Sequence, residues 1–162
     1  MSGASGFFRS RVALTLCVIA AILLVAALFV PVLDVNKRQH ANEAVAVVRL
    51  RKLGVLQGAH AASHPARGFA CQLSELKPSM PIGNSYDPDE FLLTGVQAGY
   101  KFAVTKCRTN ANGAVTQYEA TAVPVERGST GFYAFCTDQS GTIWYDSDGS
   151  GERCLTSRRL LQ

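Results

Sequence analysis

The fold expected from this chain depends on one uncharged stretch near its start, residues 12–33, which reads VALTLCVIAAILLVAALFVPVL. Its length matches the about 20 apolar residues that a helix needs to cross the hydrocarbon core of a bilayer. A cleaved signal peptide has a shorter apolar region, about 7–15 residues, that ends at small residues. This stretch instead stays bulky through Leu28, Phe29 and Val30. We therefore expect an uncleaved transmembrane helix over residues 12–33.

The composition fits one such helix attached to an ordinary small domain. The chain has 162 residues, 48% of them hydrophobic and 17% charged, with 16 Lys+Arg against 12 Asp+Glu. The charged fraction is below the about 25% of soluble domains, and the mean hydropathy of +0.10 argues against disorder. Because the excess apolarity is concentrated in residues 12–33, the remainder has the composition of a globular domain.

The charges and cysteines around the stretch indicate its orientation. Arg9 and Arg11 precede it and favour a cytoplasmic N-terminus, although several basic residues also follow it. One cysteine, Cys17, lies inside the stretch, and four lie after it without any C-x-x-C pair. Four such cysteines fit two disulfides in an oxidising compartment, and zinc is the alternative. We expect a cytoplasmic tail over residues 1–11 and an extracytoplasmic domain over residues 34–162.

An amphipathic helix is expected over residues 34–62, ending before Pro65 because the residue before a proline avoids the helical region. An apolar stripe recurs at steps of three, four and seven residues, which is typical of a helix that buries one face. Its members are Ala41, Val45, Val48, Val55 and Ala59. Charged residues, among them Glu43, are expected mostly on the other faces.

From Gly99 onward the pattern changes to the period of two that is typical of strands. Residues 78–99 are rich in proline and glycine and predict a loop. Three breaks, at Asn112-Gly113, at Pro124 to Gly128 and at Ser140-Gly141, then separate four expected strands in an antiparallel meander. One long N-terminal helix packed on a four-stranded antiparallel sheet is an α+β fold.

Several segments, in this order, resemble the type IV pilin and pseudopilin family, in particular short bacterial pilin-like proteins. They are Pro31, Asn42-Glu43-Ala44, residues 68–76 (GFACQLSEL), residues 99–102 (GYKF) and residues 135–143 (FCTDQSGTI). The likeness covers about residues 31–156. It implies a long helix, half in the membrane and half on the sheet, with Pro31 near the end of the membrane part as a kink.

The resemblance also implies function, location and partners. It implies a membrane-anchored structural or assembly protein, a minor or divergent subunit of a type IV pilus or of a type II secretion pseudopilus. It implies a single pass through a bacterial inner membrane, with the C-terminal domain in the periplasm or outside the cell. The implied partners are the lipid bilayer and other pilin-like subunits or the pilus or secretion machinery, with no small-molecule substrate.

The chain departs from the family at its processing signal. Family members are cut after a glycine, usually before Phe, and carry a glutamate at the fifth mature position. Gly6 and Phe7 could form a degenerate version of this signal, but the fifth residue from Phe7 is Arg11. This reversed charge supports the alternative function, a non-polymerising, membrane-tethered periplasmic binding or accessory module.

The four extramembrane cysteines allow three disulfide connectivities. The simplest is Cys71–Cys107 together with Cys136–Cys154. Cys136 ends one expected strand, and the chain turns at Asp148-Gly149 and can return beside it. The first pair would then tie the loop after the helix to the first strand.

A candidate calcium site lies near the C-terminus, where oxygen-bearing side chains alternate as they do in calcium loops. Its candidate ligands are Asp146, Asp148 and Glu152. The full EF-hand pattern is absent, and the alternative is a solvated Asp-Gly turn. No other cofactor is expected.

The sequence favours a protein that is not an enzyme. His60 and His64 are four residues apart, but no acid or cysteine at helical spacing completes a site, and His40 stands alone. No nucleophile elbow, P-loop or dinucleotide fingerprint occurs. The basic residues near Lys37 could contact nucleic acid, but a solvated face or a subunit contact is the simpler interpretation.

Overall fold

The computed structural model describes residues 4–76 and 90–161, and it describes side chains in the first helix at position 14, from 16 to 25 and from 35 onward. The chain divides into two compact units, Met1–Lys37 and Arg38–Gln162. Helix α1 (Ala4–Ser63) supplies the first unit and the start of the second. It ends just before His64-Pro65, as the proline rule predicts.

The first unit exposes its apolar side chains. The large apolar residues described between Leu14 and Val25 are all more than half exposed, from Leu14 at 68% to Val25 at 51%, and Val35 is 44% exposed. Among the described residues, no helix is long and apolar enough to cross a membrane. This finding contradicts the predicted transmembrane helix over residues 12–33 and the predicted single-pass location in a bacterial inner membrane. The predicted cytoplasmic tail, residues 1–11, lies outside the described side chains.

The second unit has an α+β fold built on one antiparallel sheet of six strands, where four were expected. The strands follow one another in the sheet in chain order. They are β1 (Val96–Gln97), β2 (Tyr100–Thr109), β3 (Val115–Pro124), β4 (Ala134–Asp138), β5 (Trp144–Asp146) and β6 (Arg159–Leu160).

The two additional strands, β1 and β6, are the two edges of the sheet and have two residues each. Two residues cannot display an alternating pattern, so the sequence predicted a loop where β1 lies and no strand where β6 lies. The short helices α2 (Glu90–Thr94) and α3 (Gly151–Ser157) lead into them, and a 3₁₀ helix η1 (Leu73–Leu76) lies earlier in the chain.

Helix α1 packs on the sheet through a face that the sequence analysis did not predict. The buried residues of its last part recur at steps of four and three: Gln39, Glu43, Ala46, Leu50, Leu53 and Gln57. The expected stripe is wrong, because Val48 and Val55 are 55% and 72% exposed. The periodicity argument failed because half of the buried positions carry polar side chains, which a count of apolar residues assigns to solvent.

Those polar side chains fasten loops to the helix. Gln57 pairs twice with Ala70, donating through Nε2 to its carbonyl and accepting its amide through Oε1, both at 2.8 Å. At the other end, Gln39 donates to the Gly128 carbonyl, and Asn42 donates to the Thr130 carbonyl at 2.9 Å. Because their hydrogen bonds are satisfied, these buried groups avoid the cost of unpaired polar atoms.

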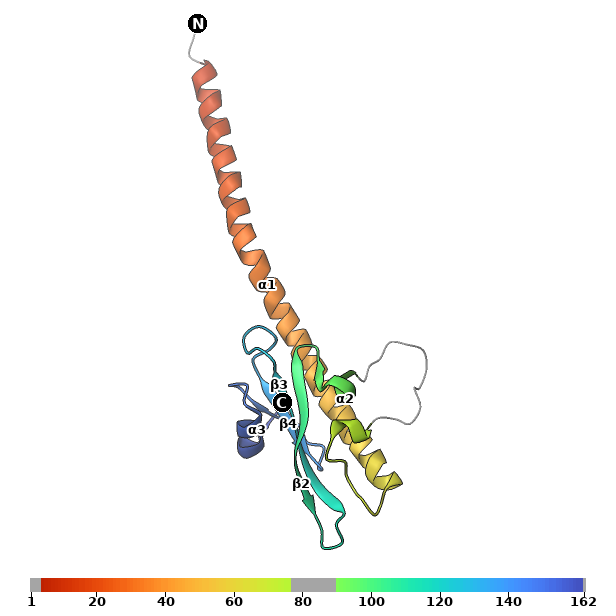
Figure 1. Ribbon diagram of the computed structural model, residues 1–162. Coiled ribbons are helices and arrows are strands. Elements are labelled where there is room, and N and C mark those ends of the chain that lie inside the picture. The colour runs from red at the N-terminus through yellow and green to blue at the C-terminus, as the bar shows by residue number, and fades with distance from the viewer. Residues whose placement is uncertain (1–3, 77–89, 162) are drawn as a thin grey trace. The chain divides into compact units, whose positions relative to one another are not determined.

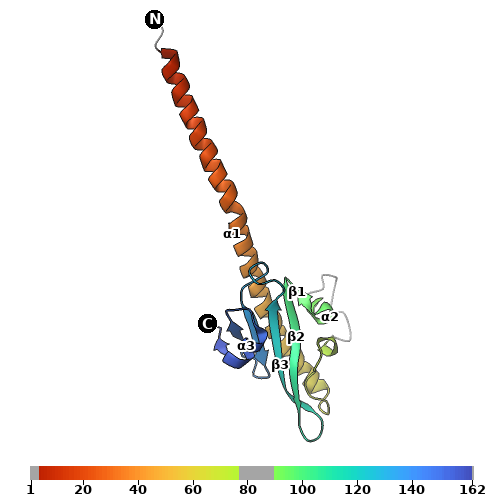
Figure 2. The same cartoon turned by 60° about the vertical axis from the view of Figure 1, so that its left-hand side comes forward.

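The sheet is covered on both faces (Figures 1 and 2). On one face, Leu50 and Leu53 of α1 pack with a cluster that includes Tyr100, Phe102 and Tyr118. On the other face, Cys136 and Trp144 pack against Cys154 of α3. The two clusters are separate because successive residues of a strand point to opposite faces.

Candidate interaction surface

In the second unit, one side of α1 is exposed and mostly apolar. Its exposed residues recur at steps of three and four: Ala41, Ala44, Val48, Arg51, Val55, Ala59 and Ala62. We call these seven residues the outer face. Six of them are apolar, and Arg51 is the one charged member. Gly58 lies beside them, and a Cβ at this position would meet no atom within 4 Å.

A face of this kind suits contact with another helix. Alanine, valine and glycine have short side chains, so two helix backbones can approach closely along them. Continuous exposed apolar surface is uncommon on a monomeric protein and marks a place that binds something else. The exposed apolar residues from Leu14 to Val25 give the first unit the same property.

The two disulfides have the predicted pairing, Cys71–Cys107 and Cys136–Cys154. The first ties the segment after α1 to β2, and the second ties α3 to β4. The segment after α1 also pairs with the start of β3, because Phe69 donates its amide to the Val115 carbonyl at 3.0 Å. The disulfides therefore act on the fold of the second unit, on both faces of its sheet. Cys17 is free and exposed.

The structure does not bring the three candidate calcium ligands together. Asp146 accepts the amides of Asp148 and Ser150 at 3.1 and 2.9 Å, which shapes the turn into α3. The Arg153 guanidinium lies 3.8 Å from the Asp146 carboxylate and 3.2 Å from that of Asp148. Glu152 lies in the first turn of α3. In the part of the chain that the structure describes, no group of three or more His, Cys, Asp or Glu residues could hold a metal ion.

Two of the three histidines, His60 and His64, make contacts at the end of α1. The rings of His60 and His64 stack with centroids 4.5 Å apart, and His60 Nδ1 lies 3.0 Å from the Gly68 carbonyl. His40 is exposed and lies 3.4 Å from the Glu43 carboxylate. These contacts show how the rings are placed, and they give no catalytic arrangement.

The degenerate processing signal and the predicted kink cannot be placed by their side chains. Gly6, Phe7 and Pro31 all fall within α1, and their side chains lie outside the described residues. Processing at Gly6 and a kink at Pro31 therefore stay predictions.

Sequence reasoning missed the outer face because it assigned the same valines and alanines to the core. It also missed Glu43, which it placed on a solvated face and which is only 7% exposed. The signal that could have found both is the polar series Gln39, Glu43 and Gln57, whose spacing of four and fourteen residues fits one helical face.

No family model, curated protein or solved structure matches this chain. The pilin-like resemblance therefore rests on the sequence segments alone.

Proposed function

We propose that this protein is a structural or assembly subunit of the type IV pilin or pseudopilin kind, which works by packing against other subunits and performs no chemistry. A minor or divergent subunit fits best, because Arg11 stands where the family has its glutamate. The observation that carries the proposal is the outer face, which leaves one side of α1 apolar and uncovered while the opposite side is buried on the sheet.

Energetic reasoning supports contact between subunits along this face. Burying apolar surface contributes about 25 cal/mol per Å², and Val48 and Val55 are the largest apolar side chains of the outer face. The neighbouring alanines add area and keep the helices close. The exposed residues of the first unit, such as Leu24 at 67%, offer a second length of helix for the same kind of packing.

Self-association of the full chain tests the proposal. Sedimentation velocity in a mild non-ionic detergent, which covers the exposed apolar residues of the first unit, should show reversible association of the second unit. The double variant Val48→Lys/Val55→Lys should weaken it by at least about tenfold, because the contact would then bury unpaired charges. Both positions are more than half exposed, so the fold should not change.

Val125→Lys is the matched control, because Val125 is 61% exposed and lies directly after β3, outside the outer face. It should associate as the unchanged chain does. If the unchanged chain stays monomeric at every concentration, the subunit proposal fails. The alternative, a non-polymerising binding or accessory module, would then be preferred, as Arg11 already suggests.

A further inference from the structure

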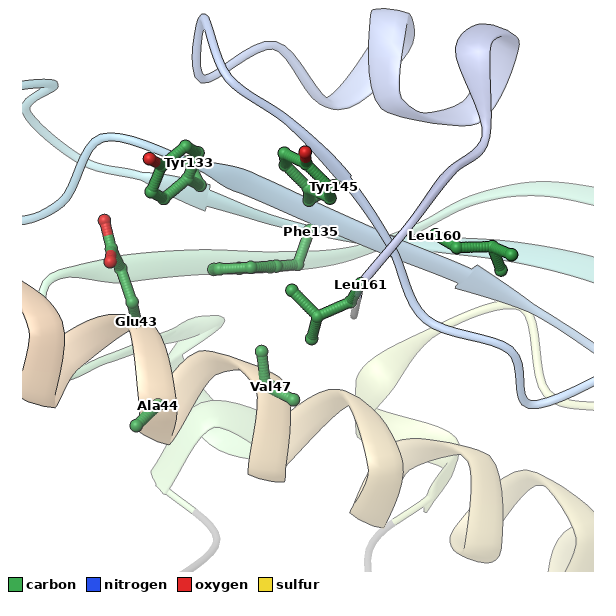
Figure 3. Close-up of a pocket in the computed structure, with 8 residues that line it drawn as sticks. All are labelled: Glu43, Ala44, Val47, Tyr133, Phe135, Tyr145, Leu160 and Leu161. Atoms are coloured by element: carbon green, nitrogen blue, oxygen red, sulfur yellow. The ribbon is translucent and has the colours of Figure 1, made fainter.

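A pocket of about 480 Å³ opens between α1 and the part of the sheet that contains β4, β5 and β6. Its lining comes from three parts of the second unit. They are α1 (Glu43, Ala44, Val47), β4 with the residue before it (Tyr133, Phe135), and β5 and β6 with the residue after β6 (Tyr145, Leu160, Leu161). Figure 3 shows the tyrosine rings along one wall, Phe135 across the back, and the Glu43 carboxylate at one side. Its volume falls in the range of ligand pockets, about 300–1,000 Å³.

The pocket combines one carboxylate with three aromatic rings. Tyr133 and Tyr145 meet edge to face, with centroids 5.8 Å apart and planes at 85°. Aromatic faces attract cations through their quadrupole, and a carboxylate adds full charge complementarity. The remaining lining, Val47 and Leu161, suits the aliphatic part of a ligand. Taken together, this lining fits an ammonium group at the end of an alkyl chain.

Glu43 has room for a cation. Its Oε1 accepts the Phe132 amide at 2.8 Å, and its Oε2 lies 3.4 Å from Nδ1 of His40, a side chain that is 73% exposed and carries charge only when protonated. Among the described residues, no lysine or arginine lies within ion-pair distance of Glu43. The buried carboxylate also raises the pKa of Tyr100, after burial itself, which is the larger cause. A nearly buried carboxylate without a permanent cation is costly.

The geometry favours lysine over arginine. Arginine binds carboxylates best through two parallel hydrogen bonds, one to each oxygen. Each Glu43 oxygen already has one neighbour, the Phe132 amide at Oε1 and His40 Nδ1 at Oε2, so two parallel bonds from an arginine would compete with both contacts. A lysine ammonium is a point charge on a four-carbon stem and needs one such oxygen.

The rim of the pocket favours a ligand carried by a protein. Leu160 is 62% exposed, and Leu161 and Tyr133 are 38% and 37% exposed, all around the opening. A free amine would leave this apolar rim in water, whereas a protein surface would cover it. We propose that the pocket is a docking site for a lysine side chain, flanked by apolar residues, on a partner protein. This goes beyond the subunit proposal. Ala44 belongs to both surfaces, but Glu43 and the aromatic rings of the pocket are not part of the outer face.

The test uses short peptide probes and the full chain in mild detergent. Acetyl-Leu-Lys-Leu-amide is titrated into isotope-labelled protein and followed by the amide NMR signals of Tyr133, Tyr145 and Leu161. The expected result is saturable shifts at these residues. Acetyl-Leu-Gln-Leu-amide, the uncharged control, should bind at least about tenfold more weakly, as expected for the loss of a charge-assisted hydrogen bond. Equal binding of the two peptides would overturn the proposal.

Two pairs of variants locate the effect. Glu43→Gln should weaken binding of the lysine peptide at least about tenfold while its amide oxygen still accepts from Phe132, and Glu126→Gln, the same change at an exposed acid, should leave it unchanged. Ala44→Lys places a competing ammonium in the pocket from an exposed position and should abolish binding. Ala111→Lys, the same change in an exposed turn, should not.

A second ligand, butylammonium, distinguishes a lysine side chain on a protein from a free small amine. Butylammonium should bind at least about tenfold more weakly than the lysine peptide, because it leaves the apolar rim uncovered. If butylammonium binds as tightly as the peptide, the pocket is a site for small amines, and the docking proposal is wrong. Unchanged peptide binding by Ala44→Lys would contradict it as well.

Discussion

The disulfide between Cys136 and Cys154 provides a quantitative test of how α3 is held on the sheet. The bond joins residues 18 positions apart, and closing a loop of that size in the unfolded chain corresponds to about 3 kcal/mol. Both cysteines are fully buried, so loss of the two sulfur atoms leaves a cavity that costs about 1 kcal/mol more. The double variant Cys136→Ala/Cys154→Ala should therefore lower the free energy of unfolding by about 4 kcal/mol.

The loss should first be visible at α3. This helix has seven residues, too few for an isolated helix to be stable in water. Trp144 is the single tryptophan of the chain. It packs in the same cluster as the disulfide and lies under the Arg158 guanidinium, 4.8 Å from the ring centroid. Urea unfolding followed by tryptophan fluorescence reports on both the stability of the domain and the environment of α3.

The other disulfide is the matched control. Cys71 and Cys107 are 36 positions apart, so the same loop argument gives about 4 kcal/mol, but both cysteines are only half-buried. Their double alanine variant should lose similar stability without a change in the native emission of Trp144. The reasoning is refuted if the Cys136→Ala/Cys154→Ala variant loses less than about 1 kcal/mol and keeps the native emission.

Three further changes test the packing of α1 and the sheet. Gln57→Met leaves both the amide and the carbonyl of Ala70 unpaired, so the unfolding free energy in urea should fall by about 2–4 kcal/mol; a loss below about 0.5 kcal/mol would contradict this. Gly131→Ala would place a Cβ 2.1 Å from the Tyr100 hydroxyl oxygen, so calorimetry should show a clearly lower Tm, and an unchanged Tm would show that the ring can move. Burial raises the pKa of Tyr118 to about 12 from 10.0, so this group adds stability below about pH 10 that is lost as the pH rises towards 12. Tyr118→Phe should make the alkaline loss of stability shallower by about 1.4 kcal/mol per pH unit, and equal slopes would contradict the assignment.

Some features of the fold could be predicted because local rules determine them. The proline after His64 ends α1, and the Asn112-Gly113 turn separates β2 from β3. The disulfide pairs followed from where the chain must return beside Cys136. Each of these depends on residues that are close in sequence or on a strong conformational preference.

Other features depend on contacts that a pattern of apolar residues does not contain. The buried face of α1 begins and ends with glutamines because their amides bond to the backbone of loops far away in sequence, at Gly128 and Ala70. The pocket beside Glu43 requires the C-terminal residues to return next to α1, which the short strand β6 accomplishes without a recognisable pattern. The expected membrane span was inferred from the length and apolar character of residues 12–33, and among the described residues no helix is long and apolar enough to cross a membrane.

The central claim is that the outer face of α1 contacts another copy of the chain. Photocrosslinking tests it most directly, with p-benzoylphenylalanine placed at Val55 in the full chain and, as the control, at Val125, which is similarly exposed. Mass spectrometry of the products should show a covalent dimer from position 55, with its crosslink on α1 of the second copy, and only background from position 125. Equal crosslinking from both positions, or none from position 55, would contradict the claim.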